Sequence, residues 1–527
     1  MEEIEEWFKT KKYPHIGKPL KINDYKRVKL YVENPEKIRK HSFLPFIHKT
    51  IIKRKYRADK QNPSKNPSKK RTRKKDTPKV RDTFFASHLD AMVFSKYNHI
   101  LSNAYEQFIE RLPFNESVVA YRKIHIEIGK KGNKCNIDFA KSAFEFIASH
   151  QDKKLSVIVA DVTSFFDNLD HKILKRQWTA VINETTLPPD HYNVFKALTR
   201  IKYVESQDLF EAYDNTMIVE RGVPNSSTQK VHVRKNMNGI RYSKEKKAVA
   251  YCEKEEFIKN NLNLVISQNN KTGIPQGSPI SATLANIYMI DFDALIFDRI
   301  KNINGFYQRY SDDLIIVCEQ QYERDIIKTL RDTIKSDITK LEIQPNKTKL
   351  YRFEIVNKLF KGFQVNEDTK GIYLNSPLEY LGFTYDGQRV LIKTSGFSKF
   401  YRSMKGAFNR SASFALRSKN PDKSIFKSRL YSRFTHKGAD RKMKYRPLPD
   451  NPKLYNKTKE YNWGNYLSYV NKTNEKMSSL NGNNAIKRQS RKSWAKFNKL
   501  MKMHESRLKV KLIKLNSRVL RSLMAKK

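Results

Sequence analysis

Two adjacent aspartates, Asp312 and Asp313, lie between apolar runs in the stretch RYSDDLIIVC. Neighbouring carboxylates repel each other and are costly to remove from water, so a compensating cation is expected beside them. A third acid, Asp161, lies near the end of the apolar run LSVIVADV (155–162). That run predicts a buried strand, and ligands of α/β sheets gather at the carboxyl ends of strands.

Three carboxylates on neighbouring strands suit phosphoryl transfer. Joining a nucleotide to a 3′-hydroxyl develops charge on the attacking and leaving oxygens, and two divalent cations ~3.5–4 Å apart neutralise that charge. Mg²⁺ is a hard ion that prefers oxygen ligands, with Mn²⁺ as an alternative. We therefore expect two Mg²⁺ ions to be held by Asp161, Asp312 and Asp313, together with the backbone carbonyl of Val162.

A Pro/Gly loop leads directly into a helix in the stretch TGIPQGSPISATLANIYM. Gly277 lets the backbone approach a flat ligand, and Gln276 offers a hydrogen-bond donor and an acceptor together. We expect both residues to bind the incoming nucleotide. A long helix is predicted over 281–300, and the runs GFYQRY and DLIIVCE predict a hairpin whose turn carries Asp312.

The charge of the chain is large and unevenly distributed. The net charge is +50, and 28 of those charges come from residues 401–527, which carry 34 Lys and Arg against six acids. Residues 53–81 carry 14 Lys and Arg with only two Asp. Such an excess predicts a polyanionic partner, either a nucleic acid or an anionic membrane surface. A mixed α/β body over about 82–400 with basic extensions on both sides is therefore expected, with one of its helices over 90–112.

Three stretches together resemble the A, B and C motifs of reverse transcriptases, namely DVTSFFD, GIPQGSPISATLANIYM and RYSDDLIIV. The closest likeness is to bacterial non-LTR enzymes of the group II intron, retron and phage-defence types. The resemblance implies an α/β (α+β) right-hand polymerase palm and fingers, with an α-helical thumb and a C-terminal helical region. The implied domains are a basic N-terminal extension (1–82), fingers and palm with an insertion between motifs A and B (83–375), a motif E primer grip (376–400), and a basic thumb and C-terminal domain (401–527).

The same resemblance assigns further roles. In AYRK, Arg122 and Lys123 would face the incoming triphosphate, and in LEIQPNKTKL, Lys347 would donate a proton to the leaving pyrophosphate. Phe166 would be the gate that excludes a 2′-hydroxyl, while Phe165 belongs to the core; the alternative places both rings in the core. Three residues near motifs C and E would contact nucleic acid: Tyr310, Leu381 and Gly382.

Basic residues of the C-terminal region are candidates for phosphate contacts: Arg429, Arg433, Lys437, Arg488 and Arg491. Their aromatic neighbours would stack on bases or pack in the core: Tyr431, Tyr466, Tyr469 and Trp494. For each single basic residue, the alternative is a solvated helix face. For the region as a whole, nucleic-acid binding is expected, with an affinity that falls as salt rises.

Several further segments, such as FLPFIHKTIIKRKYR and SHLDAMVFS, look like phage-defence reverse transcriptases of the abortive-infection kind. The resemblance implies an RNA-directed DNA polymerase that uses dNTPs and a dedicated non-coding RNA to make a DNA product in antiphage defence. One alternative is template-independent or protein-primed DNA synthesis in the same role. A second, from another class, is a non-catalytic RNA-binding protein with a polymerase-like fold.

The sequence also indicates where the protein acts. No apolar run reaches the ~18 residues of a membrane span, and the start of the chain has no apolar signal core. The three cysteines are far apart and lack zinc-site spacing. A cytoplasmic protein with no membrane partner is expected, and a homo-oligomer is left open.

Overall fold

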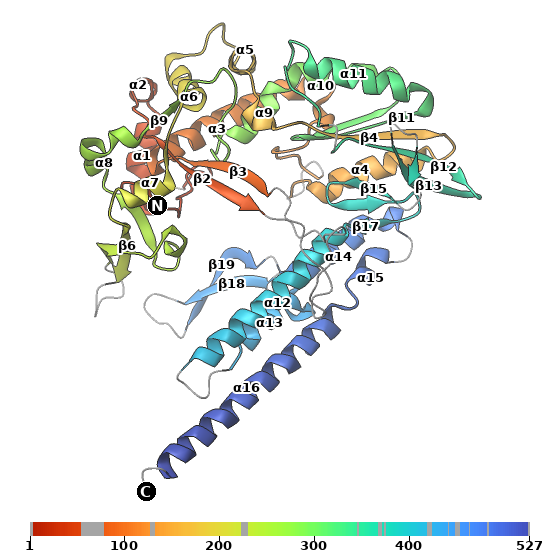
Figure 1. The fold of residues 1–527 in the computed structure, drawn as a ribbon. Helices are drawn as coiled ribbons and strands as arrows, with labels where there is room; N and C mark the ends of the chain where they lie inside the picture. Colours follow the sequence, from red (N-terminus) through yellow and green to blue (C-terminus); the bar gives the residue numbers. More distant parts are fainter. Residues whose placement is uncertain are drawn as a thin grey trace.

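A computed structural model describes most of the chain. The described ranges are 4–53, 78–126, 132–222, 230–344, 347–366, 371–373, 376–418, 424–440, 442–447, 454–462, 464–481 and 484–524. Sheets and short helices form a broad body, from which long helices of the C-terminal region extend (Figure 1). The larger part of the basic stretch 53–81, residues 54–77, lies outside the described residues.

An antiparallel six-stranded sheet forms the centre of the body. Its strand order is β10 (Phe306–Tyr310), β11 (Asp313–Glu319), β4 (Leu155–Asp161), β12 (Lys349–Val356), β13 (Leu359–Val365) and β14 (Ile372–Tyr373). The predicted strand over 155–162 is therefore β4, and the predicted hairpin is β10–β11. Apolar side chains on both faces suit β4 and β11 to an interior position.

Alternate residues of the two central strands pack into two different cores. Ile158 of β4 and Leu314 of β11 join one cluster, which we call the first core. Val157 of β4 and Ile315 of β11 join another, which we call the second core. Because side chains alternate between the faces of a strand, Asp161 and Asp313 lie on the side of the second core.

Helices cover this sheet. They are α4 (Asn136–Ser149), α9 (Ser281–Tyr288), α10 (Ile290–Lys301) and α11 (Glu323–Lys335). The single helix predicted over 281–300 is in fact two, because Met289 leaves the helical conformation with φ −92° and ψ 6°. The helix predicted over 90–112 is α3 (His88–Glu110), which runs through the first core.

Two four-stranded sheets extend the body. One has the order β1 (His15–Ile16), β8 (Ala248–Cys252), β6 (Thr216–Gly222) and β7 (Lys230–Asn236). The other has the order β3 (Lys79–Phe85), β2 (Phe46–Lys53), β5 (Ile201–Glu205) and β9 (Ile266–Gln268). Both sheets combine N-terminal strands with strands from the long segment between Asp161 and Gly277.

The predicted N-terminal extension over 1–82 is wrong as a separate unit. Its boundary falls inside β3, and β2 pairs with both β3 and β5. Trp7, Phe8 and Phe46 belong to the first core.

The other α-helices that precede α9 in the chain are α1 (Tyr25–Val32), α2 (Pro35–Arg39), α5 (His171–Val181), α6 (Pro189–Thr199), α7 (Ser206–Glu211) and α8 (Lys254–Asn260).

The predicted primer-grip region is a three-stranded sheet of β15 (Leu378–Tyr380), β16 (Phe383–Tyr385) and β17 (Val390–Ile392). The C-terminal region contains α12 (Thr394–Arg417), α13 (Lys427–Phe434), α14 (Tyr466–Lys476), α15 (Ala485–Gln489) and α16 (Ser493–Met524). The predicted boundary at residue 400 is wrong, because α12 runs through it. A hairpin of β18 (Lys442–Pro447) and β19 (Tyr455–Asn462), which the helical pattern did not predict, lies among these helices.

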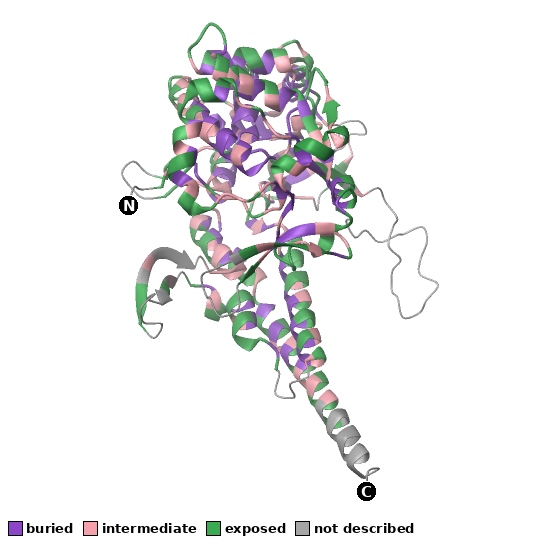
Figure 2. Cartoon of the chain, turned by 90° about the vertical axis from the view of Figure 1, so that its left-hand side faces the viewer, coloured by how far each residue is buried: buried purple, intermediate pink, exposed green. Residues whose placement is uncertain are grey.

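The degree of burial differs between the body and the C-terminal helices. Buried residues are concentrated in the body, whereas the described faces of the long C-terminal helices are largely exposed or half-buried (Figure 2). Among the described helices, none combines the length and apolar character that crossing a membrane requires.

Candidate active site

The ends of two neighbouring strands bring the predicted acids together. Asp313, the first residue of β11, lies directly opposite Asp161, the last residue of β4. Residues directly opposite each other in an antiparallel pair project from the same face of the sheet. Asp312 precedes β11 in the turn, and its carbonyl accepts a hydrogen bond from the Val162 N–H at 3.1 Å. All three aspartates are half-buried.

The buried side chain of Arg309 holds the turn that carries Asp312. Ser311 has φ of 62°, a left-handed conformation that is uncommon for a residue other than glycine. Its carbonyl accepts a hydrogen bond from Arg309 Nη1 at 3.1 Å. Arg309 in turn forms a doubly hydrogen-bonded ion pair with Asp293 of α10, at 2.7 and 2.5 Å. A buried arginine therefore fixes the backbone of the acidic turn.

The electrostatics of the site show an uncompensated excess of negative charge. Burial, together with the neighbouring charges of Asp312 and Asp161, raises the pKa of Asp313 to about 6. Lys347 partly offsets this excess, because its ammonium group forms an ion pair with Asp161 Oδ1 at 2.5 Å. Lys347, the predicted proton donor, thus lies at the predicted metal ligand.

The three carboxylates suit divalent cations, because carboxylate oxygens are hard ligands. A bound cation would also reduce the repulsion among the three negative charges. The carboxylates are not closed around one point. Within the described ranges, no group of three or more His, Cys, Asp or Glu side chains is arranged to hold a metal ion. Lys347 would compete with a cation for Oδ1 of Asp161.

The predicted Pro/Gly loop is attached to the segment that follows Asp161. The Ile274 N–H donates to the Phe166 carbonyl at 2.9 Å, and Gln276 Nε2 donates to Asp167 Oδ1 at 3.3 Å. Gly277 has φ of +108°, and a Cβ there would lie 3.2 Å from the Phe84 carbonyl oxygen. The close approach of β3 and the backbone conformation both explain a glycine at this position.

The two phenylalanines after Asp161 differ in burial. Phe165 is 3% exposed and lies in the first core, as predicted from the sequence. Phe166 is half-buried at the edge of the same core, and its ring centroid lies 5.5 Å from that of Phe165. Phe166 therefore has an accessible part next to the loop that contains Gln276.

The prediction that Arg122 faces a triphosphate is wrong. Its side chain is 5% exposed and forms an ion pair with Glu106 of α3. The remaining N–H groups donate to the carbonyls of Asn115 and Val118 and to the Asn115 side chain. All five donors of the guanidinium are used, so none is left for a ligand.

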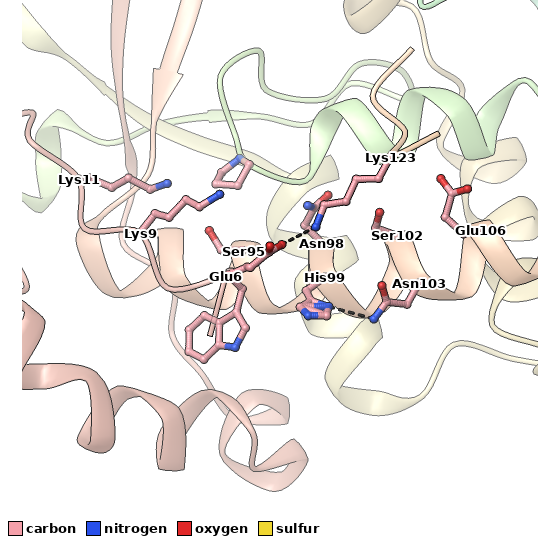
Figure 3. Close-up of a pocket in the computed structure, with 12 residues that line it drawn as sticks. Glu6, Lys9, Lys11, Ser95, Asn98, His99, Ser102, Asn103, Glu106 and Lys123 are labelled. Carbon is pink, nitrogen blue, oxygen red and sulfur yellow. Dashed lines mark hydrogen bonds and ion pairs between the residues drawn. The ribbon is translucent and has the colours of Figure 1, made fainter. Parts of the chain in front are cut away.

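Lys123, which was predicted to face the triphosphate, lines a hollow to which Pro279 of the Pro/Gly loop also contributes. Its ammonium group pairs with Glu6 of the N-terminal segment across a hollow of about 300 Å³. Figure 3 shows Lys9 and Lys11 extending over the same hollow, which α3 lines with Asn98 and Ser102.

The primer-grip candidates form the turn between β15 and β16. Leu381 and Gly382 have φ of 43° and 91°, which suits a two-residue hairpin turn. The neighbouring Tyr380 donates its hydroxyl hydrogen to Gln308 Oε1 of β10 at 3.0 Å. The turn is therefore tied to the hairpin that carries Tyr310 and Asp313. Tyr310 itself is half-buried and pairs with Asp313.

The five basic candidates of the C-terminal region are all exposed: Arg429, Arg433, Lys437, Arg488 and Arg491. Exposure is expected both for residues that contact phosphates and for residues on a solvated helix face, so it does not separate the two alternatives. Lys437 lies over the ring of Tyr431, with Nζ 5.0 Å from its centroid. Trp494 is 40% exposed and stacks on Phe497, whereas Tyr466 and Tyr469 pack against the second core.

Sequence reasoning missed the residues that support the acidic turn. Arg309 precedes the turn in the same quoted stretch, but its partners Asp293 and Asn286 lie on α10 and α9. Asn286 also donates to the Ala120 carbonyl at 2.8 Å, which connects the turn to the segment before Arg122. A charged residue inside an apolar strand was the available signal, because such a residue needs a buried partner.

Comparison with known proteins identifies part of the chain. Residues 241–385 match the family described as reverse transcriptase (RNA-dependent DNA polymerase). The matched segment contains the Pro/Gly loop, the β10–β11 hairpin and Lys347, whereas Asp161 precedes it. A search of curated protein sequences finds no match.

Similar solved structures include two telomerases. One is telomerase from Candida albicans in complex with a TWJ fragment of telomeric RNA, with 13% identity, a TM-score of 0.35, and coverage of 73% of this chain and 54% of that one. The other is apo telomerase from Candida tropicalis, with 11% identity, a TM-score of 0.34, and coverage of 74% and 58%. The chain thus spans just over half the length of these telomerase chains.

The expected mixed α/β fold with a helical C-terminal region is confirmed. The chain contains a reverse transcriptase domain, the domain of RNA-directed DNA polymerases, which are nucleotidyltransferases.

Proposed function

We propose that the chain is a reverse transcriptase that extends a 3′-hydroxyl with dNTPs on an RNA template. The observation that carries this proposal is the opposition of Asp161 and Asp313 at adjacent strand ends, with Asp312 on the β10–β11 turn next to them and Lys347 paired with Asp161. The matched reverse transcriptase domain supports the same activity.

Each element of the site has a part in this reaction. Asp161, Asp312 and Asp313, with the Val162 carbonyl, would hold two Mg²⁺ ions, which supply charge neutralisation at the reacting oxygens. Gln276 and Gly277 would hold the incoming nucleotide against the ring of Phe166, which leaves no room for a 2′-hydroxyl. Lys347 would leave Asp161 and give its proton to the departing pyrophosphate.

We further propose that the protein acts in the cytoplasm with a dedicated non-coding RNA in antiphage defence. The net charge of +50 supports a large polyanionic partner. The defence role rests on the likeness of several segments to abortive-infection reverse transcriptases. Untemplated or protein-primed synthesis, and RNA binding without catalysis, are the competing functions that the experiment must separate.

The test uses the full-length protein purified with its associated nucleic acid. The protein is incubated with Mg²⁺ and labelled dNTPs, singly and together, with and without prior RNase treatment. Asp312→Asn is the inactive variant, and Asp332→Asn is the matched control, because Asp332 is an exposed acid on α11. A product that only the parent and the control make, and that RNase abolishes, supports RNA-templated synthesis.

The other outcomes are equally informative. Product that survives RNase, especially from a single dNTP, supports untemplated or protein-primed synthesis. Equal defence by the parent and Asp312→Asn in cells challenged with phage would support RNA binding without catalysis. Sequencing the RNase-sensitive product would identify the template.

A further inference from the structure

Two adjoining cavities lie outside the candidate active site, among α5, α6 and the loop after β9. Their volumes are about 770 Å³ and 520 Å³. Lys196, Arg200 and Asn269 line both cavities, so the two adjoin, and together they are called the depression. The depression is large enough to hold several groups of an extended ligand.

Most of the charged side chains in its lining are basic. Lys172, Lys196, Arg200, Lys202 and Lys271 line it and are all exposed. Within the described part of the chain, no carboxylate lies within ion-pair distance of any of these five. Asp170 is the single acid among the lining residues.

The charge of Asp170 is already compensated. Asp170 Oδ1 accepts hydrogen bonds from the N–H groups of Lys172 and Ile173 at the start of α5. Its other oxygen lies 3.6 Å from the Lys340 ammonium group. The depression therefore presents an excess of positive charge that no neighbouring group neutralises.

An aromatic ring lies among these cations. Tyr192 of α6 is 41% exposed and stacks on Phe195, with interplanar angle 21°. Lys175 Nζ lies 5.1 Å from the Tyr192 centroid. An accessible ring beside unpaired cations is the combination with which proteins bind single-stranded nucleic acid, because bases stack while phosphates pair with the charges.

We propose that this basic groove, defined as Lys172, Tyr192, Lys196, Arg200, Lys202 and Lys271, binds a single-stranded segment of RNA outside the polymerase site. The RNA is a distal part of the partner RNA, so this inference rests on the proposed function. Figure 1 shows α5 and α6 at the top of the molecule, whereas α12 and α16 of the C-terminal region run from its middle toward its lower end. RNA held in the groove would therefore lie at the opposite end of the molecule from the tip of α16.

The test measures RNA binding by the full chain in EDTA, so that it does not depend on catalysis. The probe is fluorescein-labelled U20 RNA, and its affinity is measured by anisotropy over a range of salt. The groove variant is Lys172→Gln/Lys196→Gln/Arg200→Gln/Lys271→Gln. The control is Lys301→Gln/Arg324→Gln/Lys328→Gln/Lys335→Gln, which removes four exposed cations from α10 and α11 and gives the same net charge.

We expect the groove variant to bind at least about tenfold more weakly than the control at moderate salt. Its salt dependence should also be shallower, with a slope reduced by about 3 for four lost phosphate contacts. Tyr192→Ala should weaken binding about fivefold or more, whereas Tyr192→Phe should bind as the parent does, because stacking needs the ring and not the hydroxyl. Thermal melting establishes that each variant is folded.

Three results would overturn the proposal. Equal affinity of the groove and control variants would show that the groove takes no part in binding. An equal loss for dT20 DNA would show that it does not distinguish RNA. Displacement of the RNA by phosphatidylserine vesicles from the parent, but not from the groove variant, would show a membrane surface instead. Labelled-dNTP incorporation by the parent, beside Asp312→Asn, tests the proposed function separately from all of these.

Discussion

Arg309 and Asp293 form an ion pair from which solvent is completely excluded, with both side chains at 0% exposure. The Tyr307 hydroxyl also donates to Asp293, at 2.6 Å. Charges buried to this degree persist only where each finds a partner. Because Arg309 also holds the Ser311 carbonyl, the pair connects the stability of the fold to the position of Asp312.

Loss of Arg309 should therefore be severe. We expect Arg309→Met to lower the free energy of unfolding by about 3–5 kcal/mol, because it leaves Asp293 charged and unpaired. Arg299→Met is the matched control, since the Arg299–Asp325 pair is on the surface and should contribute about 1 kcal/mol or less. Urea unfolding measures both. If Arg309→Met lowered the free energy of unfolding no more than Arg299→Met does, the assigned role would be contradicted. The double variant Arg309→Met/Asp293→Leu should recover part of the lost free energy, because it also removes the unpaired carboxylate.

Phe166 should control the choice of sugar. We expect Phe166→Ala to raise incorporation of rNTPs relative to dNTPs by about tenfold or more, because the ring no longer occupies the space of the 2′-hydroxyl. Phe165→Ala is the control: it should lower the unfolding free energy by about 3–5 kcal/mol, with the rNTP/dNTP ratio of the parent. Single-nucleotide extension measures the ratio. Unchanged discrimination in Phe166→Ala would assign that ring to the core instead.

Lys347 should affect two quantities that can be separated. Lys347→Gln removes the competitor for Asp161, so the Mg²⁺ concentration at half-maximal rate should fall about threefold. The maximal rate should also fall by about 10²-fold or more if the ammonium group is the proton donor. Lys347→Arg keeps the charge but holds its proton, so it should lower the rate without the change in Mg²⁺ dependence. A parental rate and Mg²⁺ dependence in Lys347→Gln would remove both roles.

Acid should destabilise the N-terminal part of the body through His15. Its ring is completely buried, and burial lowers its pKa to about 4. His15 Nδ1 accepts a hydrogen bond from the Ile16 N–H, and Nε2 donates one to the Phe85 carbonyl. These two hydrogen bonds of the folded protein require the neutral ring. The unfolded chain binds a proton near pH 6.5, and the stability is therefore lost as pH falls from about 6.5 to 4, by up to about 3 kcal/mol.

Urea unfolding between pH 7.5 and 4.5 measures this effect. His15→Gln should show a shallower decline of stability with acid, because a neutral amide replaces the titrating ring. His88 also titrates in this range, because burial, and secondly the neighbouring His15, lower its pKa to about 4; most of its contribution, the part due to burial, remains in His15→Gln. The same decline in the parent and in His15→Gln would show that His15 does not titrate in this range.

The central sheet could be predicted because its signals are local. The apolar run ending at Asp161 and the hairpin around Ser311 are each encoded within a few neighbouring residues, and the structure has both as β4 and β10–β11. The break at Met289 was not predictable in this way, since the apolar period continues across it and tertiary packing decides the conformation.

Contacts with residues outside a motif explain what the sequence did not reveal. Arg122 was assigned to the ligand from a short motif, but Glu106 and Asn115, which precede it by 16 and 7 residues, use its donors, and nothing in the four letters AYRK specifies them. Likewise, the N-terminal strands were assigned to an extension because their partners, such as β5, are about 150 residues away in the chain. The composition of a segment is a local property, whereas the partner of a strand is an unpaired strand edge that can lie anywhere in the chain.

The second core also determines when the protein can be completed during synthesis. It includes Val157 of β4, and its last members along the chain are Val470, Met477 and Ile486, each 0% exposed. A nascent chain that lacks these residues leaves α4 and β17 without the helices α14 and α15 that pack on them, so apolar side chains of this core stay in water. The second core, on the side of the sheet where Asp161 and Asp313 lie, should therefore be complete only when nearly the whole protein has left the ribosome.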